Sequence, residues 1–164
     1  IKRIIQDLLS FSNPSQGGNV YVDINKLLDR TVRMLWNEIK YKLDVVKDYS
    51  ETKQIWIDPT RIGQIFLNII VNASHAIKKK KGTLTISTVE DDNNVIIRIG
   101  DDGCGIPKDQ QSQIFDPFFS TEGGTGVGLY VSQNIAETYG GTIKFETEVG
   151  KGTTFVVSLP RKAS

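Results

Sequence analysis

Two pairs of strand-like segments constrain the fold of this 164-residue chain more than any other feature. Apolar and polar residues alternate over 83–90 and 95–100, which flank an Asp-Asp-Asn-Asn turn and predict a hairpin. A second pair, 142–149 and 153–159, meets at a Gly-Lys-Gly turn. Because strand and helix patterns come in separate blocks, we predict an α+β fold, a two-layer α/β sandwich with helices on one face of the sheet.

Three other segments carry apolar residues at helical spacing, and they predict helices over 24–43, 59–79 and 126–139. Asp58-Pro59 opens the second helix with a capping acceptor and a proline whose φ suits the first turn. The third helix is stopped by Gly140-Gly141. Shorter elements are expected as strands at 43–49 and 54–57 and as a short helical piece near 108–114.

The balance of charge and the cysteine count exclude several classes of function. With 20 basic and 19 acidic residues the net charge is +1, which favours neither nucleic acid nor an anionic membrane as a partner. A single cysteine excludes a disulfide framework and a multi-cysteine metal site. Without a signal peptide, a long apolar run or a starting Met, we expect a cytoplasmic domain cut from a longer protein, whose own membrane attachment the sequence leaves open.

The first residues predict a separate segment ahead of the globular domain. Residues 1–12 have helical apolar spacing but begin without a cap, like the end of a longer helix. Residues 13–19, Asn-Pro-Ser-Gln-Gly-Gly-Asn, are typical of a linker. The domain is expected over 20–160, with 161–164 as a tail.

The helix predicted over 59–79 carries three polar residues beside its apolar stripe. Asn68, Asn72 and His75 fall within about 60° of one another on a helical projection. Asparagine favours caps and turns over helix interiors, so its presence twice needs a reason. Either these side chains face water and satisfy local hydrogen bonds, or their amide oxygens are ligands for a cation such as Mg²⁺.

Two glycine-rich segments follow. Asp101-x-Gly103-x-Gly105 comes directly after a predicted strand, so it is either a plain turn or a site where a carboxylate accepts a hydrogen bond from an amine-bearing ring. Residues 123–129, Gly-Gly-Thr-Gly-Val-Gly-Leu, run into a helix, where free amides suit phosphates. The Walker A, dinucleotide and protein-kinase motifs are absent. Between these segments, phenylalanines at 115, 118 and 119 either pin the loop to the core or latch a mobile lid.

In this order the segments resemble the ATP-binding catalytic domain of sensor histidine kinases, within the larger group that includes the gyrase, Hsp90 and MutL ATPase domains. The resemblance spans about residues 20–160 and implies a Bergerat-type ATP-binding fold with a mixed sheet, in which ATP lies between the asparagine helix and the glycine loops. The matching segments are 64–73, Asp101-x-Gly103-x-Gly105, 114–119, 124–129 and the ending 150–155.

The resemblance also implies roles for individual residues. Asn72 would coordinate the Mg²⁺ that bridges the phosphates, with Asn68 close by as the second catalytic residue. Asp101 would accept the adenine amine, with Thr153 assisting through water. His75 stands where some members carry a phosphate-contacting lysine. The other nucleotide-binding positions implied are Gly103, Gly105, Ile106, Phe119, Thr125, Gly126, Val127, Gly128 and Leu129.

One position separates the branches of this group. The ATPases, and the related serine kinases of the anti-sigma type, carry a glutamate base four residues before the metal-binding asparagine, where this chain has Asn68. A neutral imidazole needs no such base, so Asn68 favours phosphorylation of a histidine. The implied partners are the kinase's own dimerisation domain, which carries that histidine in a homodimeric parent, and a response-regulator receiver domain.

Two alternatives and two departures remain. The first alternative is a non-catalytic module that uses nucleotide to switch a protein contact. The second is an ATPase of the gyrase or Hsp90 type, which Asn68 disfavours. The only histidine, His75, lies within the asparagine helix, so the acceptor must belong to another domain. The lid is short, with only residues 121–123 between Ser120 and the Gly124-Thr125-Gly126 box: either it is trimmed or some of its residues are absent from the sequence.

Overall fold

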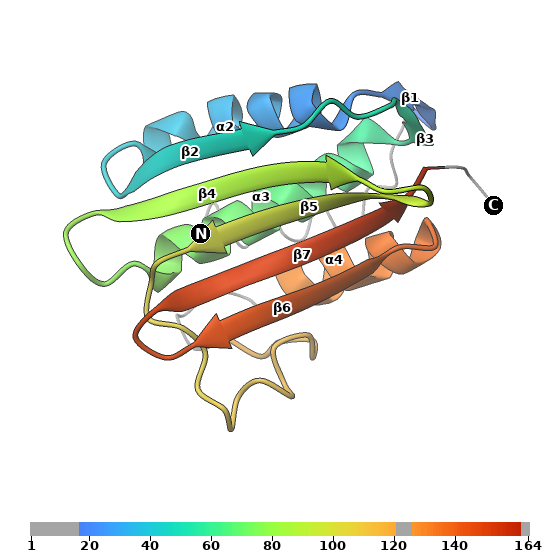
Figure 1. The fold of residues 1–164 in the computed structure, drawn as a ribbon. Coiled ribbons are helices and arrows are strands. Elements are labelled where there is room, and N and C mark those ends of the chain that lie inside the picture. The colour runs from blue at the N-terminus through green and yellow to red at the C-terminus, as the bar shows by residue number, and fades with distance from the viewer. Residues whose placement is uncertain (1–16, 121–125, 162–164) are drawn as a thin grey trace.

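The structure is a computed structural model that describes residues 17–120 and 126–161 (Figure 1). The expected helix end over 1–12, the linker up to residue 16, Thr125 and most of the expected tail lie outside these ranges. The elements are β1 (Val20–Val22), α2 (Ile24–Ile39), β2 (Leu43–Tyr49), β3 (Ile55–Ile57), α3 (Pro59–Ala76), β4 (Gly82–Glu90), β5 (Asn94–Asp101), α4 (Gly128–Thr138), β6 (Thr142–Glu148) and β7 (Gly152–Pro160).

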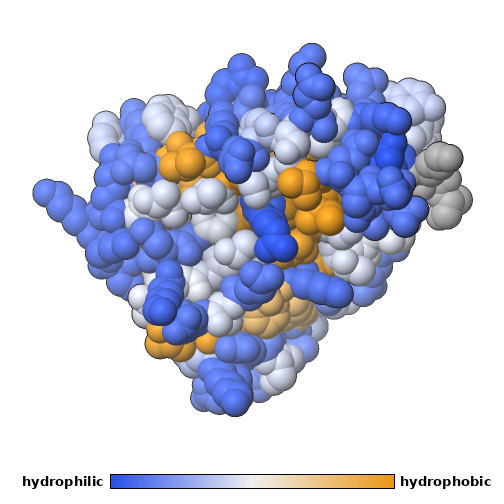
Figure 2. Space-filling view, in the orientation of Figure 1, coloured by the Kyte–Doolittle hydropathy of each residue, from blue (hydrophilic) through white to orange (hydrophobic). Residues whose placement is uncertain are grey.

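The main sheet has five strands in the order β2-β4-β5-β7-β6. β2 runs parallel to β4, and the other neighbours are antiparallel, so the sheet is mixed as expected. Both predicted hairpins are confirmed as β4–β5 and β6–β7. The three helices within the described ranges lie on one side of the sheet (Figure 1). No described helix covers the other side, which shows hydrophilic residues around smaller apolar patches (Figure 2). The predicted fold class is therefore confirmed.

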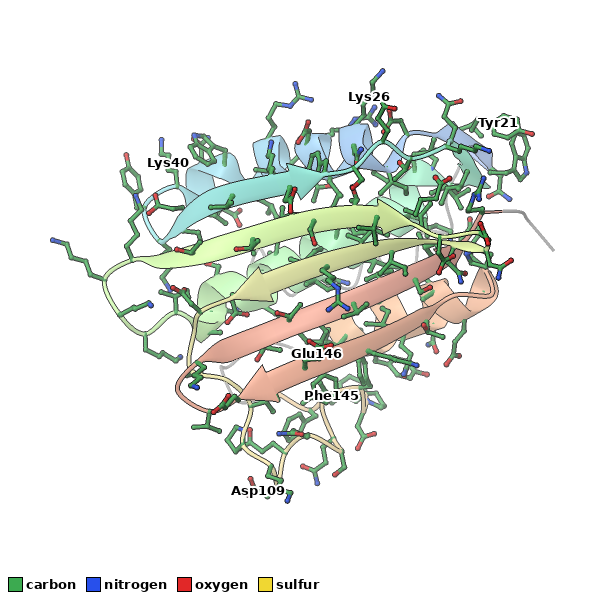
Figure 3. All side chains as sticks on the ribbon, viewed as in Figure 1. Tyr21, Lys26, Lys40, Asp109, Phe145 and Glu146 are labelled. Carbon is green, nitrogen blue, oxygen red and sulfur yellow. The ribbon has the colours of Figure 1, made fainter. Side chains whose placement is uncertain are left out.

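The hydrophobic core lies between the sheet and the helices. Strand residues at alternate positions point inward, so Leu84 and Ile86 of β4 are fully buried. Helix α2 begins at the cap Asp23, whose side chain accepts a hydrogen bond from the Lys26 N–H, and the Lys26 side chain projects away from the sheet (Figure 3). Asp29 of the same helix instead pairs with Lys47 of β2. Among the described residues, no helix combines the length and the apolar character needed to cross a membrane.

A second, two-stranded sheet was not expected from the sequence. β1 pairs antiparallel with β3, with Val20 opposite Ile57 and Val22 opposite Ile55. A three-residue strand is too short to show an alternating pattern, and it forms here because its partner supplies the hydrogen bonds. On the outer side of this pair, the rings of Tyr21 and Trp56 meet edge to face at 4.9 Å between centroids.

Three predicted helix boundaries, and one predicted helix, are corrected by the structure. α2 ends at Ile39 rather than at 43, and the next residues turn into β2. α3 ends at Ala76 rather than at 79, because Ile77 is extended (φ −81°, ψ 111°) and turns its side chain into the core. α4 begins at Gly128 rather than at 126, because Gly126 has φ 73°, which a helix does not accept. The segment 108–114 forms successive turns instead of a helix.

Candidate functional site

Asp101 lies at the end of β5, directly opposite Thr153 of β7. Its carboxylate is partly buried and accepts hydrogen bonds from the backbone N–H groups of Gly103, at 2.9 Å, and of Thr153. Burial raises the pKa of Asp101 above its usual value, although both hydrogen bonds act to lower it. The residue is therefore a desolvated acceptor, fixed by the backbone and suited to a neutral donor.

Two threonine hydroxyls extend this acceptor group. The Oγ1 atoms of Thr147 and Thr153, which face each other across the β6–β7 hairpin, are 2.8 Å apart. Thr147 also donates to the Gly152 carbonyl at 3.1 Å and accepts from the Ile106 N–H at 3.0 Å. The predicted site residue Ile106 is thus held against the sheet by Thr147, which the sequence analysis did not single out.

The two glycines after β5 lie where the backbone passes close to other elements. A Cβ on the buried Gly103 would stand 2.5 Å from the Ala76 carbonyl oxygen. Gly105 has φ 75°, and a Cβ there would overlap the Glu148 backbone. The next residue along the chain from Gly103, Cys104, donates its N–H to the Ala76 carbonyl at 2.9 Å. Glycine is therefore required at both positions, and the loop is fixed between the end of α3 and the β6–β7 turn.

The carboxylate beside Asp101 has a different environment. Asp102 accepts a hydrogen bond from the Thr83 N–H at 2.7 Å and pairs with Lys79 at 3.0 Å. Although slight burial acts to raise it, these contacts hold the pKa of Asp102 below its usual value. Asp102 therefore joins β4 to the segment after α3, whereas the Asp101 carboxylate remains available to a ligand.

The two asparagines of α3 also have different surroundings. Asn68 is 6% exposed, and its side chain contacts Gln64 of α3 and Gly128 and Ser132 of α4. Asn72, one turn later, is partly exposed, and its side chain makes no hydrogen bond to another described residue. His75 is partly exposed in the last turn of the same helix. Asn72 thus offers an amide oxygen that can bind a ligand from outside the chain.

The second glycine segment leads into α4. Gly126 has φ 73° and accepts the Phe118 N–H at 3.1 Å, so its backbone lies against residues 118 and 119. Val127 is the N-cap of α4, and its apolar side chain supplies no capping hydrogen bond. Leu129 lies in that turn and packs on the core. Thr125, also predicted here, is outside the described residues.

Two of the three phenylalanines in the loop at 115–119 pack against the domain, as the first of the two alternatives predicted. Phe115 is held between Phe145 and Phe155, with ring centroids 6.0 and 6.5 Å away, and Phe119 packs against the core. Phe118 is 78% exposed and has φ 68°, which is unusual for a residue other than glycine. Two rings therefore pin the loop to the domain, and the third faces solvent. Asp109 lies at the far tip of this loop (Figure 3).

The predicted site residues thus fall into two groups that α3 connects. Asp101, Gly103, Gly105, Ile106 and Thr153 gather at the end of the helix, whereas Gly126, Val127, Gly128 and Leu129 lie where α4 meets its middle. Across the described ranges, no three His, Cys, Asp or Glu side chains gather closely enough to hold a metal ion.

Comparison with known proteins identifies the class to which this fold and site belong. The family described as "Histidine kinase-, DNA gyrase B-, and HSP90-like ATPase" matches residues 57–163. The sensor histidine kinase ZraS of Salmonella typhi is 36% identical over 164 residues, which cover 98% of this chain and 35% of ZraS. The catalytic domain of the histidine kinase ThkA has a TM-score of 0.79 and 26% identity, covering 88% of this chain and 98% of that domain.

A third match is the structure of ThkA in complex with the response regulator protein TrrA, with a TM-score of 0.78 and 24% identity over 98% of this chain and 47% of that one. The chain belongs to the histidine kinase-, DNA gyrase B- and HSP90-like ATPase family. Within it, the chain is a catalytic ATP-binding domain of the sensor histidine kinase type. The chain spans about a third of the length of the curated relatives it matches, 35% in the case of ZraS.

Proposed function

We propose that this domain binds Mg·ATP and presents the terminal phosphate to a histidine on a separate dimerisation domain of the same, homodimeric kinase. The observation that supports this most is that α3 joins both glycine segments. Its last residue, Ala76, accepts the Cys104 N–H, and Asn68 in its middle binds the Gly128 carbonyl. A ligand that contacts both segments would therefore lie along this helix.

At the end of α3, Asp101 would bind the base. Its carboxylate is partly buried and already positioned by two backbone N–H groups, so it can accept the exocyclic amine of adenine without rearrangement. Thr153 would support the same contact through a water molecule, and Gly103 and Gly105 leave the backbone close to the ring. Burial makes this hydrogen bond stronger than it would be in bulk water.

Asn72 would hold the metal ion. Its amide oxygen is a hard, neutral ligand, its side chain has no hydrogen bond to another described residue, and it lies one turn from Asn68. Mg²⁺ prefers oxygen ligands and keeps several waters, so one side-chain oxygen is compatible with phosphate and water as the remaining ligands. When bound, the ion would neutralise charge on the phosphates. The backbone of Gly126, Val127 and Gly128 would receive the phosphate oxygens, with Thr125, Leu129, Phe119 and His75 around them.

The transfer itself needs little acid–base chemistry from this chain. The lone pair of a neutral imidazole nitrogen would form a bond to the γ-phosphorus while the bond from that phosphorus to the bridging oxygen breaks, and ADP leaves with the electron pair. Asn68 cannot act as a base, which suits a histidine acceptor better than water. The phosphoryl group would then pass to an aspartate carboxylate of a response regulator as the N–P bond breaks.

The partners and the setting follow from the same proposal. One solved relative, ThkA, is in complex with a response regulator, and we propose a receiver domain as the recipient of the phosphate here too. The acceptor histidine would lie outside this chain, because its single histidine, His75, is part of α3. We propose that the domain works in the cytoplasm, where ATP is available.

The first test is calorimetric titration of ATP with and without Mg²⁺. We expect binding that Mg²⁺ strengthens, and loss of that binding in Asp101→Ala and in Asn72→Asp with the fold intact. Unchanged ATP affinity in both variants would contradict the site. No detectable heat at millimolar ATP would mean that the nucleotide site is disabled, which would overturn the proposal.

The second test supplies a separate acceptor-helix domain. Phosphate on its histidine is expected from a kinase, whereas binding without transfer would indicate the interaction module. Release of free phosphate by the isolated chain would instead indicate an ATPase of the gyrase or Hsp90 type. Each outcome therefore assigns one of the three activities.

A further inference from the structure

Three polar side chains, two of them buried and one partly exposed, are joined by hydrogen bonds where α3 and α4 cross. Gln64 and Asn68 come from α3 and Ser132 from α4, and we call these three residues the polar clamp. Ser132 is fully buried and Asn68 is 6% exposed. Polar groups so far from water are costly unless they are hydrogen-bonded. Here three hydrogen bonds join these side chains to one another and to the Gly128 carbonyl, so the buried amide has a specific arrangement.

Asn68 is the centre of the polar clamp. Its Nδ2 donates to the Gly128 carbonyl at 2.9 Å and to the Ser132 Oγ at 3.0 Å, which uses both amide hydrogens. Its Oδ1 accepts from the Gln64 Nε2 at 3.0 Å, which fixes the orientation of the amide. A carboxylate could make neither donation, so the contacts require an amide at this position.

The polar clamp acts on the first turn of α4. Gly128 is the first residue of that helix, and its Cα packs so closely on α3 that a Cβ would lie 3.3 Å from the Asn68 Cγ. The other end of α4 is held separately, since the Tyr139 hydroxyl accepts the N–H of Asp58, the cap of α3. Loss of the polar clamp would therefore free one end of α4 and leave the other end attached.

We propose that Gln64, Asn68 and Ser132 are positioning residues, which fix the first turn of α4 on α3 and thereby set the backbone N–H groups that receive the ATP phosphates. This proposal rests on the proposed function for the phosphate contacts and deepens it. It gives Asn68 a role through Gly128 rather than through direct contact with the nucleotide. Gln64, which begins the matching segment 64–73, and Ser132, which belongs to no motif identified in the sequence, thereby acquire a role in nucleotide binding.

The test compares two ligands that share a base and differ in phosphates. In Ser132→Ala, ATP affinity is expected to fall about fivefold, the equivalent of one buried hydrogen bond, while adenosine affinity stays as in the wild type. Calorimetry measures ATP, and an NMR titration measures the weaker ligand adenosine. General loosening of the domain would weaken both ligands, because the Asp101 side of the site depends on the same core.

Thr31→Val is the matched control. The Thr31 hydroxyl is also buried and donates to the Leu27 carbonyl within α2, away from both glycine segments. Its removal costs a comparable hydrogen bond, so thermal stability should fall about as far as in Ser132→Ala, with the affinities for ATP and adenosine unchanged.

Gln64→Met provides a second variant should Ser132→Ala fail to fold. It removes only the bond that orients the Asn68 amide, and the same selective loss of ATP affinity is expected, to a smaller extent. An unchanged ATP affinity in the folded variants, or an equal loss for adenosine, would overturn the proposal. Failure of the proposed function is distinguishable, because the wild-type chain would then bind no ATP before any substitution.

Discussion

The backbone N–H of Cys104 donates a hydrogen bond of 2.9 Å to the carbonyl of Ala76, the last residue of α3. This bond satisfies one of the carbonyls that the end of a helix leaves without a partner. It also fixes the distance between α3 and the loop that begins at Asp101. The position of the proposed base-binding carboxylate therefore depends on where α3 ends.

Gly103→Ala is expected to disrupt this relationship. The new Cβ would lie 2.5 Å from the Ala76 carbonyl oxygen, and both groups belong to backbone that cannot easily move. We expect the free energy of unfolding to fall by about 1–3 kcal/mol and ATP affinity to fall with it, because the loop must shift away from the helix. Urea denaturation and calorimetric titration measure the two effects.

Gly63→Ala is the matched control for that substitution. Gly63 lies inside α3, and its added Cβ would meet only the Leu27 Cδ1, at an ordinary 3.5 Å. The same chemical change should here raise the free energy of unfolding by up to about 1 kcal/mol, because alanine favours a helix over glycine. Equal stabilities for the two variants would show that the contact at Gly103 is not tight.

Asp101→Asn is expected to raise stability at neutral pH while weakening ATP binding. Burial raises the pKa of Asp101, so the folded chain binds the proton more tightly than the unfolded chain does. Ionisation of Asp101 therefore lowers the free energy of unfolding. This loss is absent below the unfolded pKa, grows as the pH rises through the folded pKa, and is complete above both values. The isosteric amide removes this cost, although its NH₂ group is a donor and suits the adenine amine less well.

The measurement is the difference in unfolding free energy between Asp101→Asn and the wild type across pH. The gain in the variant should be largest at neutral pH and disappear below the unfolded pKa of a carboxyl group. The lowered pKa values of Asp29 and Asp91 act in the opposite sense, but those residues are present in both proteins and cancel in the difference. A stability difference that does not vary with pH would contradict the assignment.

The sequence predicted the elements better than their ends. Alternating residues such as Val95, Ile97 and Ile99 predicted β5 because each inward position is buried by the helices. The end of α3 could not be predicted, because it depends on the distant Cys104 N–H, and neither could the start of α4, which depends on the left-handed backbone of Gly126. Such tertiary contacts leave no local pattern.

The candidate site was predicted where motifs carry it and missed where packing does. Asp101 and Asn72 stand in segments whose glycines and asparagines are unusual for a strand end and a helix. Thr147 and Ser132 are ordinary residues in regular elements, and only strand register and helix crossing bring them to the site. Thr147 did leave one signal, since it shares the inward face of β6 with Ile143 and Phe145.

Tyr139→Phe is expected to lower the free energy of unfolding by about 1 kcal/mol or more. The hydroxyl accepts the Asp58 N–H at 3.2 Å and donates to the Asn19 Oδ1 at 2.9 Å, so it joins the end of α4 to the start of α3 and to the residue before β1. Its removal would leave the Asp58 N–H without that acceptor. Thermal and urea unfolding both report the change.

Tyr41→Phe is the control for the loss of a phenol hydroxyl. Tyr41 is 77% exposed, and the Lys40 ammonium lies over its ring, a contact that phenylalanine retains. We expect its stability to match that of the wild type within about 0.5 kcal/mol. If Tyr139→Phe were equally neutral, the hydroxyl would not join the three segments.

Arg161→Ala is expected to lower the free energy of unfolding by about 1–3 kcal/mol. The Arg161 Nε lies 3.2 Å from the Glu90 Oε1, with side chains 21% and 16% exposed, and its Nη1 donates to the carbonyls of Asp91 and Asp92 at 3.1 and 3.2 Å. These contacts close the β4–β5 turn against the residue that follows β7. Removing the guanidinium would leave Glu90 partly buried without its cation.

Two further variants test this interpretation. Arg161→Lys should recover only part of the loss, because an ammonium cannot reach the carboxylate and both carbonyls at once as the planar guanidinium does. Lys151→Ala, which breaks the exposed pair with Glu148 (75% and 67%), should change stability by no more than about 0.5 kcal/mol. If Arg161→Ala were as neutral as Lys151→Ala in urea denaturation, the contacts of Arg161 would be no stronger than those of an exposed ion pair.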